Sequence, residues 1–444
     1  MKNMQMVYVP VGVPTFELVS AQRLFEESCE MLKSIYPECV CPEKMLLSLD
    51  DLKCYLDLIH PDMIVLQNVT FANSAYAEEV FSRFQCPIVH WTLREPVIDG
   101  GRLRLNSLTG AYSASNAHRA YRDAGPLFHF IGMPEEEEIR REIKAIVKAV
   151  GLKKKLSTVT IASIGNTPQG FGFGRATDAR IRSAFGVKLE SYEARELIKR
   201  AKQYSDEEMA ADLPQVESIV SGLSEVPENN VYDFLRLARA YREFVRENHI
   251  DALSSRCWPD FFTEFGTPVC MALSLLNDDG IPASCEADTY GALSMLIGSC
   301  LSGGPVFFGD PVSLDEENSA VTFWHCGAGA CSLAKDGTKA GVHCNRKIGP
   351  TCEFVCRPSE SVSLIRVGAE PDGGFRILLK RGWIEPRVQP FIGTSAVVKM
   401  EDAEGFVNNT IEDGWEPHFV VAFSDIGREL YYLARILDID FYEY

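Results

Sequence analysis

The stretch EADTYGALSMLIGSCLSGGPVFFGD, residues 286–310, decides how this chain folds. Between Asp288 and Asp310 it runs for 21 residues without Asp, Glu, Lys, Arg or His. A run of this length could cross a membrane, but a Gly-Gly-Pro sequence interrupts the continuous backbone hydrogen bonding that a membrane span needs. We therefore predict a buried helix over residues 290–301, a turn, and a short buried strand over residues 306–308.

Carboxylates stand at both ends of this uncharged run. Glu286 follows an extended stretch at residues 280–284, and Asp310 follows the strand predicted at residues 306–308. Open α/β sheets bind their ligands at the carboxyl ends of the strands. We therefore expect both acids at that edge of a helix-covered sheet, and His418, from a distant part of the chain, as a candidate partner.

Two carboxylates and one imidazole form a ligand set that suits Mn²⁺ or Mg²⁺, with water or substrate oxygens completing the coordination. In the alternative interpretation, Glu286 and Asp310 cap the helices that follow them, and His418 is a loop histidine with local hydrogen bonds. The residues alone leave both interpretations open.

Composition excludes several classes of protein. A hydrophobic content of 46% and a charged content of 24% are typical of a globular protein. The formal net charge of -18 argues against nucleic-acid and anionic-membrane partners, because both need a basic face. Residues 1–14 lack the apolar region of a secretory signal, and the 14 cysteines include no C-x-x-C pair. We therefore expect a cytoplasmic protein with reduced, mostly buried thiols.

The 444 residues are too many for one ordinary core, and we expect three domains. These are two α/β domains with parallel sheets, at residues 1–154 and 155–312, and a β-rich C-terminal domain with a final helix, at residues 313–444.

Hydrophobic periodicity places the elements within these domains. In the first domain we predict strands at 7–11, 63–66 and 87–91 and helices at 16–35 and 74–84. A further helix is predicted to begin at Pro134, which four glutamates follow, and to end at Lys153–Lys155. The acidic residues then lie at the positive end of the helix dipole and the basic residues at its negative end. The remaining predictions are a strand at 158–162, helices near 178–185 and 231–248, β-like runs at 361–367, 375–379 and 396–400, and a last helix at 427–437.

Residues 286–292, 306–310 and 415–430 resemble the L-fucose isomerase and L-arabinose isomerase family, in particular its short, fucose isomerase-like members. The likeness continues through residues 163–189 and covers most of the chain. It implies a fucose isomerase-like fold and an aldose–ketose isomerase. It also implies that the acids and the histidine bind Mn²⁺, or another divalent cation such as Mg²⁺ or Co²⁺, and that Glu286 and Asp310 move the proton.

The chemistry of such an isomerase explains these residue types. Converting an aldose to a ketose moves a proton between neighbouring carbons through an enediol, so a base and an acid are needed. A divalent ion that chelates both oxygens stabilises the developing negative charge.

Three further side chains are predicted to contact the substrate. His325 stands where the arabinose branch of the family has a histidine ligand and the fucose branch has none. We predict a substrate contact first and a fourth metal ligand second, with a core histidine as the alternative. Trp258 and Trp415 are predicted to place their rings against the sugar, although tryptophan is more often a core residue.

Arginines supply the candidate binding groups for an anionic substrate. Arg175 directly follows a glycine-rich stretch, residues 165–174. This stretch either presents backbone amides to an anion or is a flexible connection. Its glycine spacing matches no nucleotide-binding fingerprint. Arg102 and Arg104 belong to a loop, and arginine side chains in a loop are usually solvated. The family resemblance implies a homo-oligomer in which the first domain of a neighbouring subunit covers each active site, so these two arginines are predicted to reach a neighbour's substrate.

The short members of this family include isomerases that convert sulfoquinovose to 6-deoxy-6-sulfofructose. Because the three arginines are available for an anionic end, we rank this substrate first and the neutral sugars L-fucose, D-arabinose and L-arabinose second. A cytoplasmic sugar-binding or sensor protein is the alternative from another class, since tandem α/β domains also build binding proteins.

Overall fold

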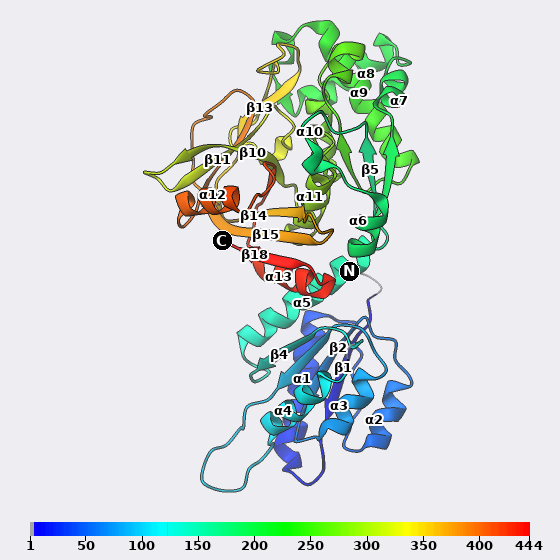
Figure 1. The fold of residues 1–444 in the computed structure, drawn as a ribbon, viewed down its shortest axis with the longest axis vertical. Helices are drawn as coiled ribbons and strands as arrows, with labels where there is room; N and C mark the ends of the chain where they lie inside the picture. Colours follow the sequence, from blue (N-terminus) through cyan, green and yellow to red (C-terminus); the bar gives the residue numbers. More distant parts are fainter. Residues whose placement is uncertain (1–3, 122) are drawn as a thin grey trace. The chain divides into compact units, whose positions relative to one another are not determined.

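The computed structural model describes residues 4–121 and 123–444 and divides into two compact units (Figure 1). The first unit contains the chain up to Lys154 together with Arg428–Ile436, and the second contains Lys155–Gly427 together with Leu437–Tyr444. None of the helices in the described ranges combines the length and the apolar character required to span a bilayer. Within the described residues the cysteines are free thiols, and Cys54 is the exposed one among them.

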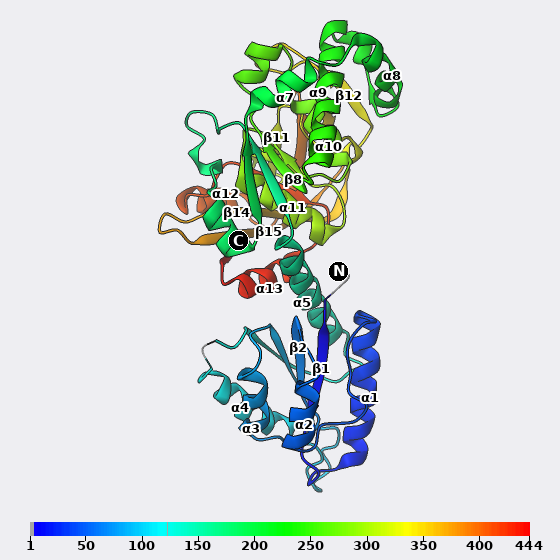
Figure 2. The same cartoon turned by 90° about the vertical axis from the view of Figure 1, so that its right-hand side faces the viewer.

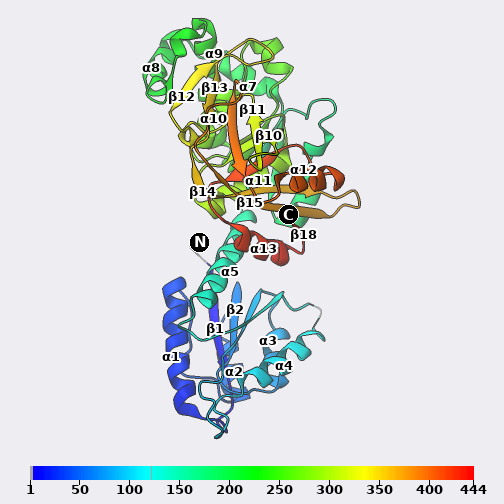
Figure 3. The same cartoon turned by 90° about the vertical axis from the view of Figure 1, so that its left-hand side faces the viewer.

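The first unit is a parallel four-stranded sheet in the order β1-β2-β3-β4, covered by helices on both faces. Figures 2 and 3 show α1 on one face of this sheet and α3 and α4 on the other. Its elements are β1 Met6–Val11, α1 Leu18–Ile35, α2 Leu49–Leu56, β2 Met63–Asn68, α3 Ser74–Phe81, β3 Ile88–Thr92, α4 Ser107–His118, β4 Leu127–Ile131, most of α5 Glu137–Leu156 and most of α13 Gly427–Leu437.

The strands and long helices of this unit confirm the periodicity prediction, because β1, β2 and β3 are buried along their whole length. Continuous apolar runs are typical of parallel strands with both faces covered. The sequence prediction missed α2, α4 and β4. In α4 the sequence SLTGAYSASNAH has small and polar residues in place of an apolar stripe, so its pattern is weak.

The second unit begins with another parallel sheet, in the order β6-β5-β8-β9. This part contains β5 Thr160–Ile164, α6 Asp178–Phe185, β6 Lys188–Tyr192, α7 Ala194–Ala201, α8 Asp206–Glu217, β7 Val220–Ser221, α9 Glu228–Glu247, β8 Ala252–Ser255, α10 Cys270–Asp278, β9 Ala283–Ser284 and α11 Thr289–Ser302. Because the strands are parallel, the segments that follow β5, β8 and β9 all leave the sheet at the same edge.

The remainder of the second unit is β-rich. Six strands, in the order β15-β14-β17-β10-β11-β16, form a barrel that closes where Trp383 pairs with Lys399. The elements are β10 Phe307–Asp315, β11 Ala320–His325, β12 Thr338–Gly341, β13 Thr351–Val355, β14 Ser359–Ala369, β15 Phe375–Ile384, β16 Thr394–Lys399, α12 Ala403–Glu412, β17 Phe419–Ala422 and β18 Asp440–Glu443.

Helix α11 lies between the parallel sheet and the barrel. It contacts β8 and β9 on the sheet side and β14 and β17 on the barrel side. A helix that is covered all round must be apolar all round, and this explains why residues 289–309 carry no charge. The predicted buried helix is therefore confirmed.

The predicted place of Asp310 is wrong in one respect. We expected it at the carboxyl end of a strand in the helix-covered sheet, but it is the fourth residue of β10, an antiparallel strand of the barrel.

The predicted domain boundary after residue 312 falls inside β10. The strand continues through exposed residues 311–313, with a register shift after Pro311, so its second half lacks the apolar signal on which the prediction depended.

Candidate metal centre and active site

Glu286 is held on a tight turn between β9 and α11. Glu286 and Ala287 both have left-handed backbone conformations, with φ of 58° and 55°. A non-glycine residue in this region costs about 1–2 kcal/mol, so the surrounding packing must hold the turn. Asp288 helps to hold it by capping α11, since its Oδ1 accepts a hydrogen bond from Gly291 N at 2.8 Å.

The structure brings Glu286, Asp310 and His418 together from three separate segments. Nε2 of His418 lies 3.2 Å from Oε2 of Glu286 and 3.3 Å from Oδ1 of Asp310. The His418 side chain is 1% exposed, yet this nitrogen makes no well-angled hydrogen bond within the described residues. Ligand atoms that all lie within 4.8 Å of one another come from Glu286, His418 and a second histidine, His325. Asp310 adds a second carboxylate beside the same His418 nitrogen, so the donors gathered here are of the kinds that bind a divalent ion.

His325, at the end of β11, adjoins this cluster. Its ligand nitrogen lies within 4.8 Å of the ligand atoms offered by Glu286 and His418, and its side chain is buried. Its Nδ1 has no hydrogen-bond partner in the described part of the chain. The position next to the cluster agrees with both predicted roles, substrate contact and fourth ligand, which stay predictions.

A buried ion pair behind the cluster orients His418. Nδ1 of His418 lies 2.9 Å from Oδ2 of Asp288, and the Arg366 guanidinium lies 2.6 Å from the same carboxylate oxygen. Neither side chain of the pair is more than 1% exposed. Metal-bound histidines commonly donate their second ring N–H to a carboxylate in this way, which points the free nitrogen toward the ion.

The electrostatics of the cluster favour a cation. Burial opposes the charge on Glu286, but the adjacent His418 imidazole outweighs the effect of burial and lowers the pKa of this carboxyl. Partial burial raises the pKa of Asp310. Burial alone would lower the pKa of His418, but the carboxylates of Asp288 and Glu286 beside its two ring nitrogens raise it to about 9. A site that draws a proton onto its imidazole in this way favours positive charge, and its donor set fits a divalent cation.

Trp258 joins Glu286 at one wall of a cavity of about 260 Å³. Its indole Nε1 donates a hydrogen bond to Oε1 of Glu286 at 3.3 Å. His325, Asn345 and Arg346 also line this cavity, together with a group of thiols. The predicted contact residues Trp258 and His325 thus share one cavity with a candidate ligand.

Trp415 contacts a different set of side chains. Its ring lies under the Arg376 guanidinium, 4.0 Å from ring centroid to the carbon of the cation, and its Nε1 donates to the Tyr444 hydroxyl at 2.6 Å. The neighbouring Glu416 carboxylate lies 3.9 Å from Arg366. The structure therefore gives Trp415 a packing role, and its predicted substrate contact has no support from these interactions.

Arg102 and Arg104 lie in the first unit, apart from the segments that form the cluster. A guanidinium nitrogen of Arg102 donates to the Thr15 carbonyl, and Arg104 donates to the carbonyl of Arg102 at 2.6 Å and to Asp99 at 3.2 Å. Their predicted role at a substrate depends on a neighbouring subunit, and it stays a prediction.

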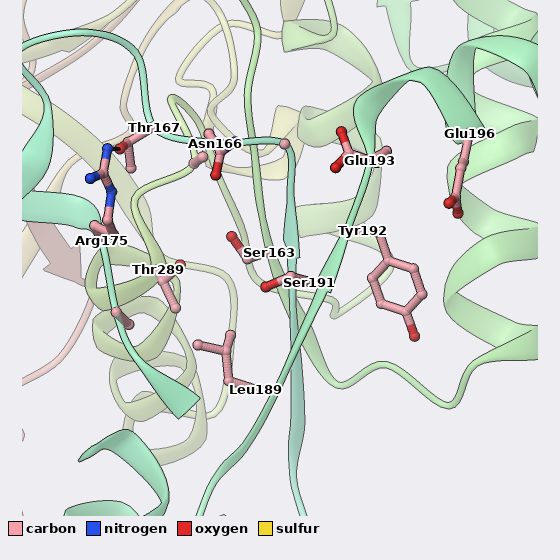
Figure 4. A pocket seen from close by; sticks show the side chains of 13 residues that line it. Ser163, Asn166, Thr167, Arg175, Leu189, Ser191, Tyr192, Glu193, Glu196 and Thr289 are labelled. Carbon is pink, nitrogen blue, oxygen red and sulfur yellow. Dashed lines mark hydrogen bonds between the residues drawn. The ribbon is translucent and has the colours of Figure 1, made fainter. Parts of the chain in front are cut away.

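Arg175 lines a second pocket at the carboxyl end of β5 and β6 (Figure 4). Its Nη2 donates to Oγ1 of Thr167 at 3.1 Å, so it is partly held in place. The pocket is rich in hydroxyl groups and borders the Glu286 turn through Ala287 and Thr289, but it contains none of the three candidate ligands. The hydroxyl-bearing side chains that Figure 4 labels there are Ser163, Thr167, Ser191, Tyr192 and Thr289.

Comparison with known proteins gives consistent relatives over the whole chain. The chain is 52% identical over 443 residues to the sulfoquinovose isomerase of Clostridium sp. (strain MSTE9), covering 99% of both proteins. It is 36% identical over 447 residues to the sulfoquinovose isomerase of Priestia megaterium (strain ATCC 12872 / QMB1551), again covering 99% of both. It is 34% identical over 439 residues to that of Alkalicoccus urumqiensis, covering 98% of both. No protein-family model matches the chain.

Proposed function

Because this chain belongs to the sulfoquinovose isomerase family, we propose that it converts sulfoquinovose, a 6-sulfo aldose, to 6-deoxy-6-sulfofructose at the Glu286–Asp310–His418 cluster. The names of these relatives support an aldose–ketose isomerase that acts on sulfoquinovose. The observation that carries the assignment to this cluster is the convergence of two carboxylates on one buried imidazole nitrogen.

We assign proton transfer to the two carboxylates. Both lie beside Nε2 of His418, at 3.2 and 3.3 Å, so a sugar bound at the cluster is expected to contact both acidic side chains. One carboxylate removes the proton from the carbon beside the carbonyl group and returns it to the neighbouring carbon. The other takes the proton from the hydroxyl oxygen on the carbon beside the carbonyl group and gives a proton to the former carbonyl oxygen, so the carbonyl group changes place with no net gain or loss of protons.

The surrounding side chains keep this geometry. Asp288 orients His418, Arg366 balances the Asp288 charge, and Trp258 holds the Glu286 carboxylate from the cavity side. A divalent cation, which we propose to be Mn²⁺ with Mg²⁺ or Co²⁺ as alternatives, would be held by Glu286, Asp310 and His418 and would stabilise negative charge on the sugar oxygens. The donor set and the resemblance to L-fucose and L-arabinose isomerases both support this.

Removing divalent cations tests the proposed function directly. We expect the purified protein to form the ketose from sulfoquinovose, chelation to stop the reaction, and added Mn²⁺ to restore it, because the oxygen-rich donor set needs a cation to accept the substrate oxygens. Ketose formation, measured with sulfoquinovose and with L-fucose, D-arabinose and L-arabinose, provides the readout. Undiminished turnover in a metal-free preparation contradicts the metal assignment, whereas a preference for a neutral sugar contradicts the substrate.

We also propose that the active protein is a homo-oligomer in which the first unit of a neighbouring subunit contributes Arg102 and Arg104 to the substrate. Arg102→Ala, Arg104→Ala and Arg175→Ala are each expected to raise the KM for sulfoquinovose more than for a neutral aldose, because a desolvated charge pair is worth roughly 2–5 kcal/mol. Steady-state kinetics on both types of sugar, with sedimentation to establish the oligomer, checks this. Equal effects on charged and neutral sugars, or a monomeric active protein, would contradict it.

A further inference from the structure

Arg346 is the cationic side chain that shares a cavity with Glu286. The residues that line the cavity include Glu286, His325, Asn345 and Arg346. The pocket around Arg175 contains none of the candidate ligands, so the two pockets are not equivalent. Among the arginines considered so far, Arg346 is therefore the one that lines the same cavity as Glu286.

Trp258 fixes the position of Arg346 relative to the cluster. The guanidinium carbon of Arg346 lies 5.7 Å from the centroid of the Trp258 ring and 5.9 Å from that of Phe262. The same indole donates its N–H to Glu286. One indole ring therefore contacts both the cation and the Glu286 carboxylate. Cation–π contact holds a guanidinium in place without neutralising its charge.

Arg346 also lacks an acidic partner. No carboxylate oxygen among the described residues lies within 4.0 Å of its guanidinium nitrogens. By contrast, the nearby Arg256 is paired with Asp260 at 2.8 Å. The side chain is exposed and lines the cavity, and in a chain of net charge -18 an unpaired cation that shares a cavity with Glu286 is suited to an anionic ligand.

We propose that Arg346, assisted by the side-chain amide of Asn345, binds the sulfonate group of the substrate. This inference rests on the proposed function, because it needs a sugar with an anion at the end of the carbon chain remote from the carbonyl group. The reacting carbons lie at Glu286, the middle of the sugar lies along the Trp258 ring, and the sulfonate reaches the guanidinium. A guanidinium presents several N–H donors in one plane, which matches the oxygens of a sulfonate.

Kinetics of Arg346→Gln tests the proposal. With sulfoquinovose at saturating Mn²⁺ we expect the KM to rise by about 30-fold while kcat falls much less, because the lost interaction is remote from the reacting carbons. Arg346→Lys keeps the charge but loses the planar donor set, so its KM is expected to lie between those of the wild type and Arg346→Gln. Neutral 6-deoxyglucose, used as a competing ligand, is expected to keep its inhibition constant within about threefold, since it has no sulfonate.

Arg182→Gln is the matched control. Arg182 is an exposed arginine on α6 of the same unit and lines neither pocket, so its KM is expected to equal that of the wild type. A KM for Arg346→Gln within twofold of the wild-type value, or an equal loss for the charged and neutral sugars, overturns the proposal while the isomerase function stands. A wild-type protein that leaves sulfoquinovose unconverted overturns the function and this inference together.

Discussion

Glu286→Gln and Asp310→Asn are each expected to lower the turnover of sulfoquinovose by about 100-fold or more, because each change removes a proposed proton-transfer group and weakens a proposed cation ligand. Both substitutions preserve side-chain size, so the packing around them changes little. The Glu286 carboxylate also accepts the Trp258 indole N–H at 3.3 Å, and the glutamine Oε1 can still accept it. The loss is therefore expected in kcat at saturating Mn²⁺, while circular dichroism reports an unchanged fold.

Glu317→Gln provides the control for this prediction. Glu317 is an exposed acid in the turn between β10 and β11, in the same part of the chain as Asp310, and its neutralisation is expected to leave kcat unchanged. Near wild-type turnover in either active-site variant, with the fold and the Mn²⁺ affinity intact, would remove that carboxylate from the mechanism.

Parts of the site could be predicted because they depend on local sequence. Glu286 follows a short strand of a parallel sheet, and such strands place functional residues at their carboxyl ends. The uncharged run after Asp288 predicted a helix covered on every side, and α11 confirms it. The final helix was predicted at residues 427–437, which are the bounds of α13, because its apolar stripe is strong.

The fold around Asp310 could not be predicted in the same way. A short apolar run such as residues 306–308 is equally typical of a buried parallel strand and of a barrel strand. Antiparallel pairing of β10 with β17 and β11 joins segments that are far apart in the sequence, and nothing in the run specifies those partners. The acid was nevertheless found because it ends the uncharged run, and the barrel brings it to His418.

The sequence prediction missed the orienting pair of Asp288 and Arg366, although the sequence around Arg366 indicates a buried arginine. Arg366 lies in the middle of the strand sequence SLIRVGA, where the neighbouring side chains are apolar and buried. An arginine is almost never fully buried without a partner, so this position predicts a buried carboxylate somewhere in the fold. The partner is 78 residues away, and only the packing of β14 against α11 shows that it is Asp288.

Arg366→Met is expected to lower the free energy of unfolding by about 3–5 kcal/mol, because it removes the guanidinium that balances the Asp288 charge in the core and leaves His418 as the remaining charge partner of that carboxylate. The two side chains are 0% and 1% exposed and make two contacts, at 2.6 and 3.2 Å, so water cannot replace the lost guanidinium. The pKa of Asp288, held low by Arg366 and His418 against the effect of burial, shows that its charge depends on these partners. Urea unfolding followed by tryptophan fluorescence measures the loss.

Arg195→Met separates the loss of a buried partner from the loss of any ion pair. Arg195 pairs with Glu264 at 2.9 Å, but its side chain is 75% exposed, so water replaces the interaction and no measurable change in stability is expected. Arg366→Lys keeps the charge but not the paired contacts with Asp288, and its stability is expected to fall between those of the wild type and Arg366→Met. An Arg366→Met protein as stable as the Arg195→Met control would contradict the prediction. The contact with His418 would then be sufficient to balance the Asp288 charge in the core.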